Sequence, residues 1–482
     1  MTEARVTRRA LLGAAAGAGV ATVTVGGLPA WARPVARTHL RRPDSLPFPR
    51  LPAGHPSMPE IKHIVVLMME NHSFDNILGM VSHQVRGRES VDGLRVRHGH
   101  PVDYNRDIYG RKFFARHASS PCQLNSQPSQ AWDASHESFD GGLNDGFVRA
   151  SGPSAMLYWD KRDLPFTYSL ARHFPIGERF FSSVLAQTYP NRRFFFAGTA
   201  SGLISTSIAT LSTPVANGTI YDRFDAHGIT YGNYYQEVAS WLLFPGILNP
   251  PGRSARMHQM AQFYADAAAG RLPQFTFVDP HYTTTSEENP QDIQVGEQFV
   301  ARVVNAVTHA PTWKNTALFL TYDEHGGYYD HVAPPPAIKP DSIPPKIAPG
   351  DAPSGYDRYG FRVPMIVISP WARRRYVSRV IQDHASMTAF IERKWNLPAM
   401  TFRDANADPM TDYFDFSRPS FAKPPPLAAP PPLGPGIAAC HAQGITPPLP
   451  TSATEGATSA RGARLGGGRS AWRDLQRATG TS

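Results

Sequence analysis

The sequence has very little cysteine: Cys122 and Cys440 are the only two in 482 residues. Two thiols exclude a thiolate metal cluster and a scaffold held together by many disulfides. One bridge between these two residues is compatible with an oxidising compartment, and two unpaired buried thiols are an equal alternative. Any metal in this protein must therefore be bound mainly by oxygen or imidazole ligands.

The body of the chain also carries little net positive charge. The formal net charge is +9, of which residues 1–32 carry +2 and residues 451–482 carry +3, leaving +4 for the rest of the chain. We identify no Lys/Arg-rich run interleaved with aromatic residues. This distribution argues against a nucleic-acid-binding protein.

Long uncharged stretches are also scarce, and the one at 10–30 resembles the apolar part of a signal peptide. It follows the pair Arg8-Arg9 and ends at Ala30-Trp31-Ala32, which offers an A-x-A cleavage site. An N-terminal membrane anchor is the alternative, since the run is long enough to span a bilayer. Its Gly and Ala content favours a cleaved signal, so we expect export through the twin-arginine machinery to the cell envelope or the medium.

Composition divides the chain into four parts. We expect a signal peptide at 1–32, an extended lead-in at 33–58, a folded domain at 59–422, and a Pro-rich linker with a disordered basic tail at 423–482.

Within the folded domain, strand-like and helix-like patterns alternate. The predicted strands are 61–69, 229–235, 274–278, 318–322 and 363–369, and the predicted helices are 163–174, 221–226, 296–307 and 384–395, the last capped by Asp383. Residues 84–131 show little periodicity and are expected to be loops, and 188–192 is expected to be a turn. The alternation predicts an α/β fold with a largely parallel central sheet.

Acidic residues follow several of these strands directly. Glu70-Asn71 follows the first, Asp279 the third and Asp323-Glu324 the fourth. In parallel α/β sheets, sites form outside the carboxyl ends of the strands, so these side chains are expected to converge there. Carboxylate and amide oxygens suit a divalent cation. The residues alone leave open whether they bind metal or merely cap helices.

Other polar residues have two possible roles. Thr188 precedes a Tyr-Pro-Asn-Arg segment and would be an ordinary turn residue, unless a nearby metal activates its hydroxyl as a nucleophile. Arg192 is either structural or a partner for an anionic oxygen. His136, His331 and His384 stand beside acids or in Gly-rich loops, which raises the chance that at least two donate protons or bind phosphate.

Three long motifs, taken together, resemble a known family. They are Glu70-Asn71-His72-Ser73-Phe74-Asp75, Thr188-Tyr189-Pro190-Asn191-Arg192, and Asp323-Glu324-His325-Gly326-Gly327-Tyr328-Tyr329-Asp330-His331. They occur in the same order in the bacterial phosphoesterases that include haemolytic and non-haemolytic phospholipases C and acid phosphatases. The resemblance extends over about residues 60 to 416.

The resemblance implies an alkaline-phosphatase-like three-layer α/β/α sandwich and an exported metal-dependent phospholipase C. Its substrate would be a phosphatidylcholine-like phospholipid at a membrane surface, cleaved to diacylglycerol and a phosphorylated head group through a phospho-threonine intermediate. The alternatives are a phosphomonoesterase of the acid-phosphatase type and a catalytically weakened member that binds lipid or envelope. A divalent ion is implied, with Ca, Zn and Mn as candidates.

The same resemblance assigns roles to individual residues. The implied metal ligands are Glu70, Asn71, Asp323 and Glu324; the implied catalytic residues are Thr188, His136, His331 and Asn289; and the implied substrate contacts are Asn191, Arg192, Asp145 and His384. Two positions depart from the family pattern, because Asn289 and Gln130 stand where relatives usually have histidine. An amide can hold a phosphate oxygen but cannot donate a proton as imidazolium does.

Overall fold

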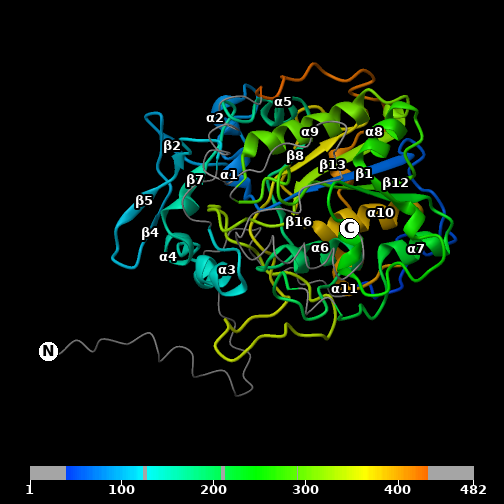
Figure 1. The fold of residues 1–482 in the computed structure, drawn as a ribbon, viewed down its shortest axis with the longest axis horizontal. Helices are drawn as coiled ribbons and strands as arrows, with labels where there is room; N and C mark the ends of the chain where they lie inside the picture. Colours follow the sequence, from blue (N-terminus) through cyan, green and yellow to red (C-terminus); the bar gives the residue numbers. More distant parts are fainter. Residues whose placement is uncertain (1–39, 123–127, 208–211, 290, 433–482) are drawn as a thin grey trace.

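The computed structural model describes residues 40–122, 128–207, 212–289 and 291–432. Its centre is an eight-stranded sheet with the order β11-β10-β12-β1-β13-β14-β8-β15 (Figure 1). The strands are β1 His63–Met69, β8 Ile176–Gly177, β10 Tyr231–Tyr235, β11 Met257–Gln259, β12 Phe275–Asp279, β13 Thr316–Tyr322, β14 Met365–Ile368 and β15 Val377–Ser378.

The middle of this sheet is parallel, as predicted. β1 lies between β12 and β13 and pairs with both in parallel register, with Leu67 opposite Val278 on one side and Leu320 on the other. Nearly every residue of these strands is buried, which explains their continuous apolar sequence. The strand predicted at 363–369 is β14, which pairs antiparallel with β13.

Helices cover both faces of the sheet (Figure 1). One layer contains α5 Pro165–His173, α8 Met260–Ala268 and α9 Ile293–Thr308, and the other contains α6 Thr188–Ala197, α7 Ile220–Ala226, α10 His384–Trp395 and α11 Phe402–Asn406. The α10 helix has the predicted bounds, and Asp383 caps it in a capping box with Ser386. The three-layer α/β/α architecture is therefore confirmed.

A group of small elements lies at one end of the sheet (Figure 1). They are α1 Phe74–Leu78, α2 Val81–Gln84, β2 Val96–Arg97, β3 His100–Pro101, β4 Tyr104–Arg106, β5 Lys112–Phe114, β6 Arg116–His117, α3 Trp132–Phe139, α4 Phe147–Ser151 and β7 Leu157–Tyr158. The prediction that 84–131 consists of loops was wrong in part. Its strands have two or three residues each, too few to produce a readable period of two.

The segments flanking the domain also contact it. Asn396 donates hydrogen bonds to the carbonyls of Leu51 and Pro52 in the lead-in, and Gln298 of α9 donates to the carbonyl of Pro431 in the Pro-rich segment. Cys122 is disulfide-bonded. Cys440, the other cysteine of the sequence, the predicted signal peptide and most of the predicted tail lie outside the described residues. Among the residues that are described, no helix has the length and apolar character needed to cross a membrane.

Candidate active site

The acidic residues predicted to converge do meet at one edge of the sheet. Met69 and Tyr322 are paired across β1 and β13, so Glu70 and Asp323 leave the two strands at the same level. β12, the other neighbour of β1, ends at Asp279. All three carboxyl groups are almost completely buried. Burial of several acids at one point requires compensation by cations, protons or hydrogen-bond donors.

Asn71 joins the ends of β1 and β13. Its backbone has a φ of 68°, in the left-handed region that Asn tolerates better than most residues, and its N–H donates to Asp323 Oδ1 at 3.1 Å. One atom of its side-chain amide lies 2.6 Å from Glu324 Oε1 and 3.2 Å from Asp323 Oδ1. An amide nitrogen there donates to both carboxylates, whereas an amide oxygen there needs a cation between the three oxygens.

The closely spaced glycines after Glu324 permit this arrangement. A Cβ on Gly326 would lie 1.9 Å from the carbonyl oxygen of Asn71, and the φ of Gly326 is +64°. The Gly326 N–H donates to Glu324 Oε2 at 2.7 Å, which fixes the direction of that carboxylate. A glycine at 326 is therefore needed both for the turn and for the close approach of the two strand ends.

Arg192 is the basic residue that faces this acidic group. Its Nε donates to Asp323 Oδ2 at 3.0 Å and its Nη1 to Asp279 Oδ1 at 3.1 Å, while its Nη2 lies 3.8 Å from Glu70 Oε1. Burial alone would lower the pKa of Arg192, but Tyr282 and these carboxylates raise it, so the guanidinium is charged. In this structure the sequence-predicted substrate contact Arg192 is engaged with the protein's own carboxylates.

One guanidinium does not balance the charge of the acidic group. The carboxyl groups around it are Glu70, Asp279, Glu288, Asp323 and Glu324. Burial and then the neighbouring charge of Glu288 raise the pKa of Glu70 well above its ordinary value; burial and then Asp323 do the same for Glu324. Glu70 Oε2 is buried and has no hydrogen-bond partner. An excess of buried oxygen ligands with an orphaned carboxylate oxygen fits a divalent cation.

Thr188 brings a hydroxyl to this group. It is the first residue of α6, and its Oγ1 lies 3.5 Å from the amide atom of Asn71 that also faces Glu324 and Asp323. The prediction of a simple turn at 188–192 was wrong, because these residues form the first turn of a ten-residue helix. Pro190 is compatible with that position, since its missing N–H would have no partner within the first turn of a helix.

Two predicted substrate contacts hold the surrounding backbone. Asn191 Nδ2 donates to the carbonyl of Ala186 at 2.8 Å, and its Oδ1 accepts from the N–H of Val184 at 3.1 Å. His384 Nε2 lies 2.9 Å from the carbonyl of Tyr322, at the end of β13, and burial lowers the pKa of this imidazole. Both side chains therefore position the loop and the strand end that carry Thr188 and Asp323, and their contact with substrate stays a prediction.

The two predicted catalytic histidines lie in different surroundings. His136 is half-buried, its Nδ1 lies 2.7 Å from the carbonyl of Trp132, and burial lowers its pKa. His331 is held between Asp75 and Asp92, at 2.6 and 3.0 Å. Burial alone would lower the pKa of His331, but these two carboxylates raise it to about 10.

A cavity of about 630 Å³ lies beside His331. Asp145, the remaining predicted substrate contact, lines the same cavity, and so do Arg95, Arg106 and Arg179. None of Thr188, Glu70, Asn71, Asp323 or Glu324 lines it. The predicted residues thus divide into a buried group at the sheet edge and a second group around the cavity.

The two positions that depart from the family pattern are near the sheet edge. Gln130 Oε1 lies 3.1 Å from the Asn71 amide. Asn289 Oδ1 accepts a hydrogen bond of 2.5 Å from the hydroxyl of Tyr328, in the glycine-containing segment after Glu324. Both amides therefore lie beside the groups predicted to bind metal and phosphate.

Sequence reasoning missed three members of the buried group: Glu288, Tyr282 and Ser240. Tyr282 and Ser240 each donate a hydroxyl hydrogen bond to Asp279 Oδ1, at 2.7 and 2.5 Å. The pair Glu287-Glu288 is visible in the sequence, but no strand precedes it directly, so its position beside Glu70 had no local signal.

Two sets of side chains within the described residues have three ligand atoms close enough together to hold a metal ion, and the sheet-edge group is not one of them. They are Asp75, Asp330 and His331, and His117, Asp160 and Asp163. An arginine already contacts each set: Arg362 donates to Asp330 and Asp75 at 2.8 and 3.0 Å, and Arg162 to Asp160 at 2.8 Å. We retain the sheet-edge group as the candidate metal site because five buried carboxyl groups there face a single guanidinium.

Comparison with known proteins supports the motif resemblance. The model of the Phosphoesterase family matches residues 61–398. The chain is 31% identical over 403 residues to non-specific phospholipase C1 of Arabidopsis thaliana, covering 77% of this chain and 74% of that protein. It is 29% identical to phospholipase C B of Mycobacterium tuberculosis, covering 76% and 79%, and 28% identical to hemolytic phospholipase C of Pseudomonas aeruginosa, covering 74% and 56%.

Among solved structures, one similar chain is a protein of the alkaline phosphatase superfamily from Vibrio parahaemolyticus. The match has a TM-score of 0.34 and 10% identity, and it covers 60% of this chain and 74% of that one. The family assignment therefore comes from the sequence comparisons, whose matched region includes both acidic strand ends and Thr188. This chain belongs to the phosphoesterase family.

Proposed function

We propose that this protein is a metal-dependent phospholipase C that hydrolyses the phosphodiester bond of phospholipids to diacylglycerol and a phosphorylated head group. The observation that carries the proposal is the Thr188 hydroxyl at the helix N-terminus, 3.5 Å from the side chain of Asn71, which itself contacts Asp323 and Glu324. A hydroxyl nucleophile beside oxygen ligands for a divalent cation is the arrangement that phosphoryl transfer needs. The names of the similar proteins support a phosphodiester as the substrate class.

In the first step of the proposed mechanism, Thr188 Oγ1 attacks phosphorus and loses its proton, and the bond from phosphorus to the glycerol oxygen breaks. The departing oxygen takes up a proton and leaves as diacylglycerol. Water then attacks the phospho-threonine, restores the hydroxyl and releases the phosphorylated head group. A divalent ion held by Glu70, Asn71, Asp323 and Glu324 would lower the pKa of the attacking hydroxyl and neutralise phosphate charge.

The protein's own groups hold this arrangement in place. Arg192 orients Asp323 and Asp279 through hydrogen bonds of 3.0 and 3.1 Å. Its fixed positive charge also reduces the repulsion between the buried carboxylates and an incoming phosphate. Since the group is buried, each of these charges acts in a medium that screens it less than water does.

Removing the Thr188 hydroxyl tests the mechanism. Thr188→Ala should lower turnover of phosphatidylcholine by at least about a hundredfold with unchanged metal content, because the nucleophile is lost and the metal ligands are intact. Thr188→Ser, which keeps a hydroxyl, is the matched control and should retain measurable turnover. Near-normal activity of Thr188→Ala would move the nucleophile to another residue, with Ser182 and Ser183 the next to test.

The substrate assay also separates the alternatives. Wild-type protein is assayed in parallel on phosphatidylcholine and p-nitrophenyl phosphate, with several divalent metals and at several pH values. Turnover of the monoester alone would support the phosphatase alternative. Turnover of neither substrate would overturn both enzymatic functions and leave a lipid- or envelope-binding role.

We also propose that the protein acts outside the cytoplasm, on the strength of Arg8-Arg9 and the uncharged run that follows. The double substitution Arg8→Lys, Arg9→Lys preserves charge but removes the twin-arginine pattern. It should retain the full-length precursor in the cytoplasmic fraction. Unchanged export of that variant would reject the twin-arginine route.

A further inference from the structure

A short hairpin at the edge of the molecule displays an unusual combination of side chains. β4 Tyr104–Arg106 and β5 Lys112–Phe114 pair antiparallel and are joined by the turn 107–111 (Figure 1). In that figure the hairpin projects from the end of the molecule that holds the small elements, away from the two helical layers. Nothing in the proposed catalytic mechanism uses it.

One face of the hairpin is buried against the protein and the other is exposed to solvent. Asn105 is buried on the inner face, where its Oδ1 accepts a hydrogen bond from the N–H of Phe147 at 2.9 Å, and Phe113 is partly buried beside it. The outer face carries two cross-strand pairs, Tyr104 with Phe114 and Arg106 with Lys112, and all four side chains are exposed.

This outer face is apolar as well as basic. Tyr104 and Phe114 are 38% and 47% exposed, with ring centroids 5.4 Å apart, and Ile108 and Tyr109 at the tip are 72% and 78% exposed. Leu143, 70% exposed, lines the His331 cavity together with Tyr104. Five of the nine large exposed hydrophobic side chains found in the described residues are therefore in this one region. An apolar concentration of that kind marks an interaction surface.

The segment 95–117, which contains the hairpin, is positively charged. Residues 95–117 contain six Lys or Arg against Asp103 and Asp107, a net charge of +4, which equals the net charge of residues 33–450. The sequence interpretation that no basic run is interleaved with aromatic residues was therefore wrong for this segment. Arg106 and Lys112 stand directly opposite each other, and like charges in that position destabilise a strand pair. An anion bound between them would relieve this repulsion.

The basic groups also lie close to the aromatic rings. Lys112 Nζ is 4.3 Å from the centre of the Tyr104 ring, and the Arg111 guanidinium is 5.4 Å from that of Tyr109. Aromatic rings that sit at head-group depth, flanked by cations that contact phosphates, are typical of proteins bound at a membrane surface. A soluble acidic partner would explain the charge but not the exposed Ile108 and Tyr109.

We propose that the β4–β5 hairpin is a docking element for the surface of a phospholipid bilayer that contains anionic lipids. The tip residues Ile108 and Tyr109 enter the interface, and Arg106 and Lys112 contact lipid phosphates. Tyr104 and Arg106 also line the His331 cavity, so docking brings that cavity close to the lipid head groups. The inference rests on the proposed phospholipase function, which requires contact with a lipid surface, but the binding itself does not require turnover.

The experiment measures co-sedimentation of the full-length protein with sucrose-loaded vesicles of phosphatidylcholine and phosphatidylglycerol in a 7:3 ratio, with pure phosphatidylcholine vesicles in parallel. Arg106→Gln, Lys112→Gln should weaken partitioning to the mixed vesicles by roughly 30-fold, from about fivefold per basic side chain. Ile108→Ser, Tyr109→Ser should weaken it on both vesicle types by about tenfold. Wild-type binding should fall as salt is raised.

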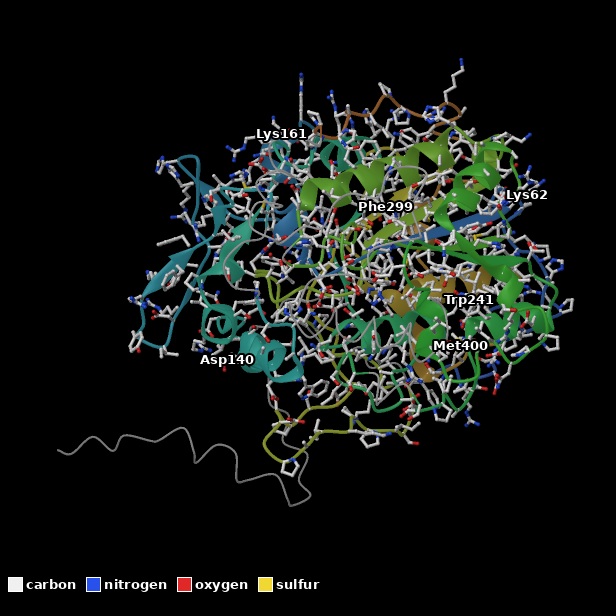
Figure 2. All side chains as sticks on the ribbon, in the orientation of Figure 1. Lys62, Asp140, Lys161, Trp241, Phe299 and Met400 are labelled. Atoms are coloured by element: carbon white, nitrogen blue, oxygen red, sulfur yellow. The ribbon has the colours of Figure 1, made fainter. Side chains whose placement is uncertain are left out.

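The control is Lys62→Gln, Ile347→Ser, which removes one exposed cation and one exposed apolar side chain outside the hairpin. Figure 2 shows Lys62 at the opposite end of the molecule from the small elements. This variant should partition as wild type does. Equal loss in the control, or wild-type binding by both hairpin variants, would overturn the proposal. Unchanged thermal unfolding would show that the hairpin variants are folded.

Hydrolysis of water-soluble p-nitrophenylphosphorylcholine separates this inference from the proposed function. Wild-type protein that cleaves the soluble diester without binding vesicles would refute the docking element and leave the enzyme intact. Protein that binds vesicles through the hairpin but cleaves no diester would keep the docking element and refute the phospholipase. If both hold, the variant Ile108→Ser, Tyr109→Ser, whose residues do not line the cavity, should lose activity on vesicles and keep it on the soluble diester.

Discussion

His331 offers a quantitative test of the electrostatics beside the cavity. Its two ring nitrogens lie 2.6 Å from Asp75 Oδ2 and 3.0 Å from Asp92 Oδ1. Arg362 contacts the same Asp75 carboxylate at 3.0 Å, so the arrangement alternates cations and anions. His331→Asn keeps a polar side chain of similar reach and removes the titrating charge.

The expected effect on the free energy of unfolding follows from the pKa of His331, which is about 10 in the folded protein against an ordinary value of 6.5. Because the folded-state value is the higher one, protonation stabilises the fold, fully below pH 6.5 and progressively less as the pH rises through 10. The difference in pKa corresponds to a stabilisation of the folded state by about 5 kcal/mol at most. This stabilisation falls by about 2.5 kcal/mol between pH 7 and pH 9. Asp92 is 40% exposed, so solvent screening weakens its interaction with His331. We therefore expect the stabilisation by His331 to decrease by at least about 1 kcal/mol between pH 7 and pH 9.

The assay is urea unfolding of wild-type and His331→Asn protein at pH 6, 7, 8 and 9. The difference in free energy of unfolding between the two proteins should be largest at pH 6 and shrink steadily towards pH 9. Titrating groups that do not interact with His331 cancel in that difference because both proteins contain them. A difference that stays constant with pH would refute the assignment of a charged imidazolium.

The other predictions concern the buried group at the sheet edge. Asp323→Asn should lose bound metal, measured by elemental analysis after dialysis, because an amide replaces a carboxylate ligand; retention of stoichiometric metal would reject Asp323 as a ligand. Gly326→Ala should lower activity far more than Gly99→Ala: both have positive φ, but only the Cβ at 326 collides with the backbone of Asn71, while that at 99 meets nothing within 4 Å. Equal activities of these two variants would show that the close approach is unimportant.

The sequence predicted the sheet well where burial alone determines the pattern. β1 and β13 are buried on both faces, so each appears as an uninterrupted apolar run ending at a pair of polar residues. Their parallel direction follows from the alternation with helices, so Glu70 and Asp323 are expected at the same edge of the sheet. That β1 and β13 are direct neighbours is seen only in the structure. α10 was predicted to the residue because its cap, Asp383, is a local signal.

Contacts between distant segments could not be predicted in this way. Glu288 is placed beside Glu70 by a loop after β12, and no periodicity or cap indicates where a loop leads. The exposed face of the β4–β5 hairpin was missed for a related reason. Three-residue strands alternate too briefly to be distinguished from a loop, although Tyr104, Arg106, Lys112 and Phe114 are spaced by two.

The helical conformation of 188–192 explains the four-residue spacing between Thr188 and Arg192. Thr188 and Arg192 are four residues apart, so on α6 they lie on the same side of the helix, whereas in an isolated turn they would not. That side faces the strand ends: Thr188 Oγ1 contacts Asn71 and Arg192 Nε contacts Asp323. Asn191 anchors the preceding loop through Ala186. One rigid helical turn thus fixes the proposed nucleophile and the countercharge of the metal ligands together, so a change that displaces α6 should impair both at once.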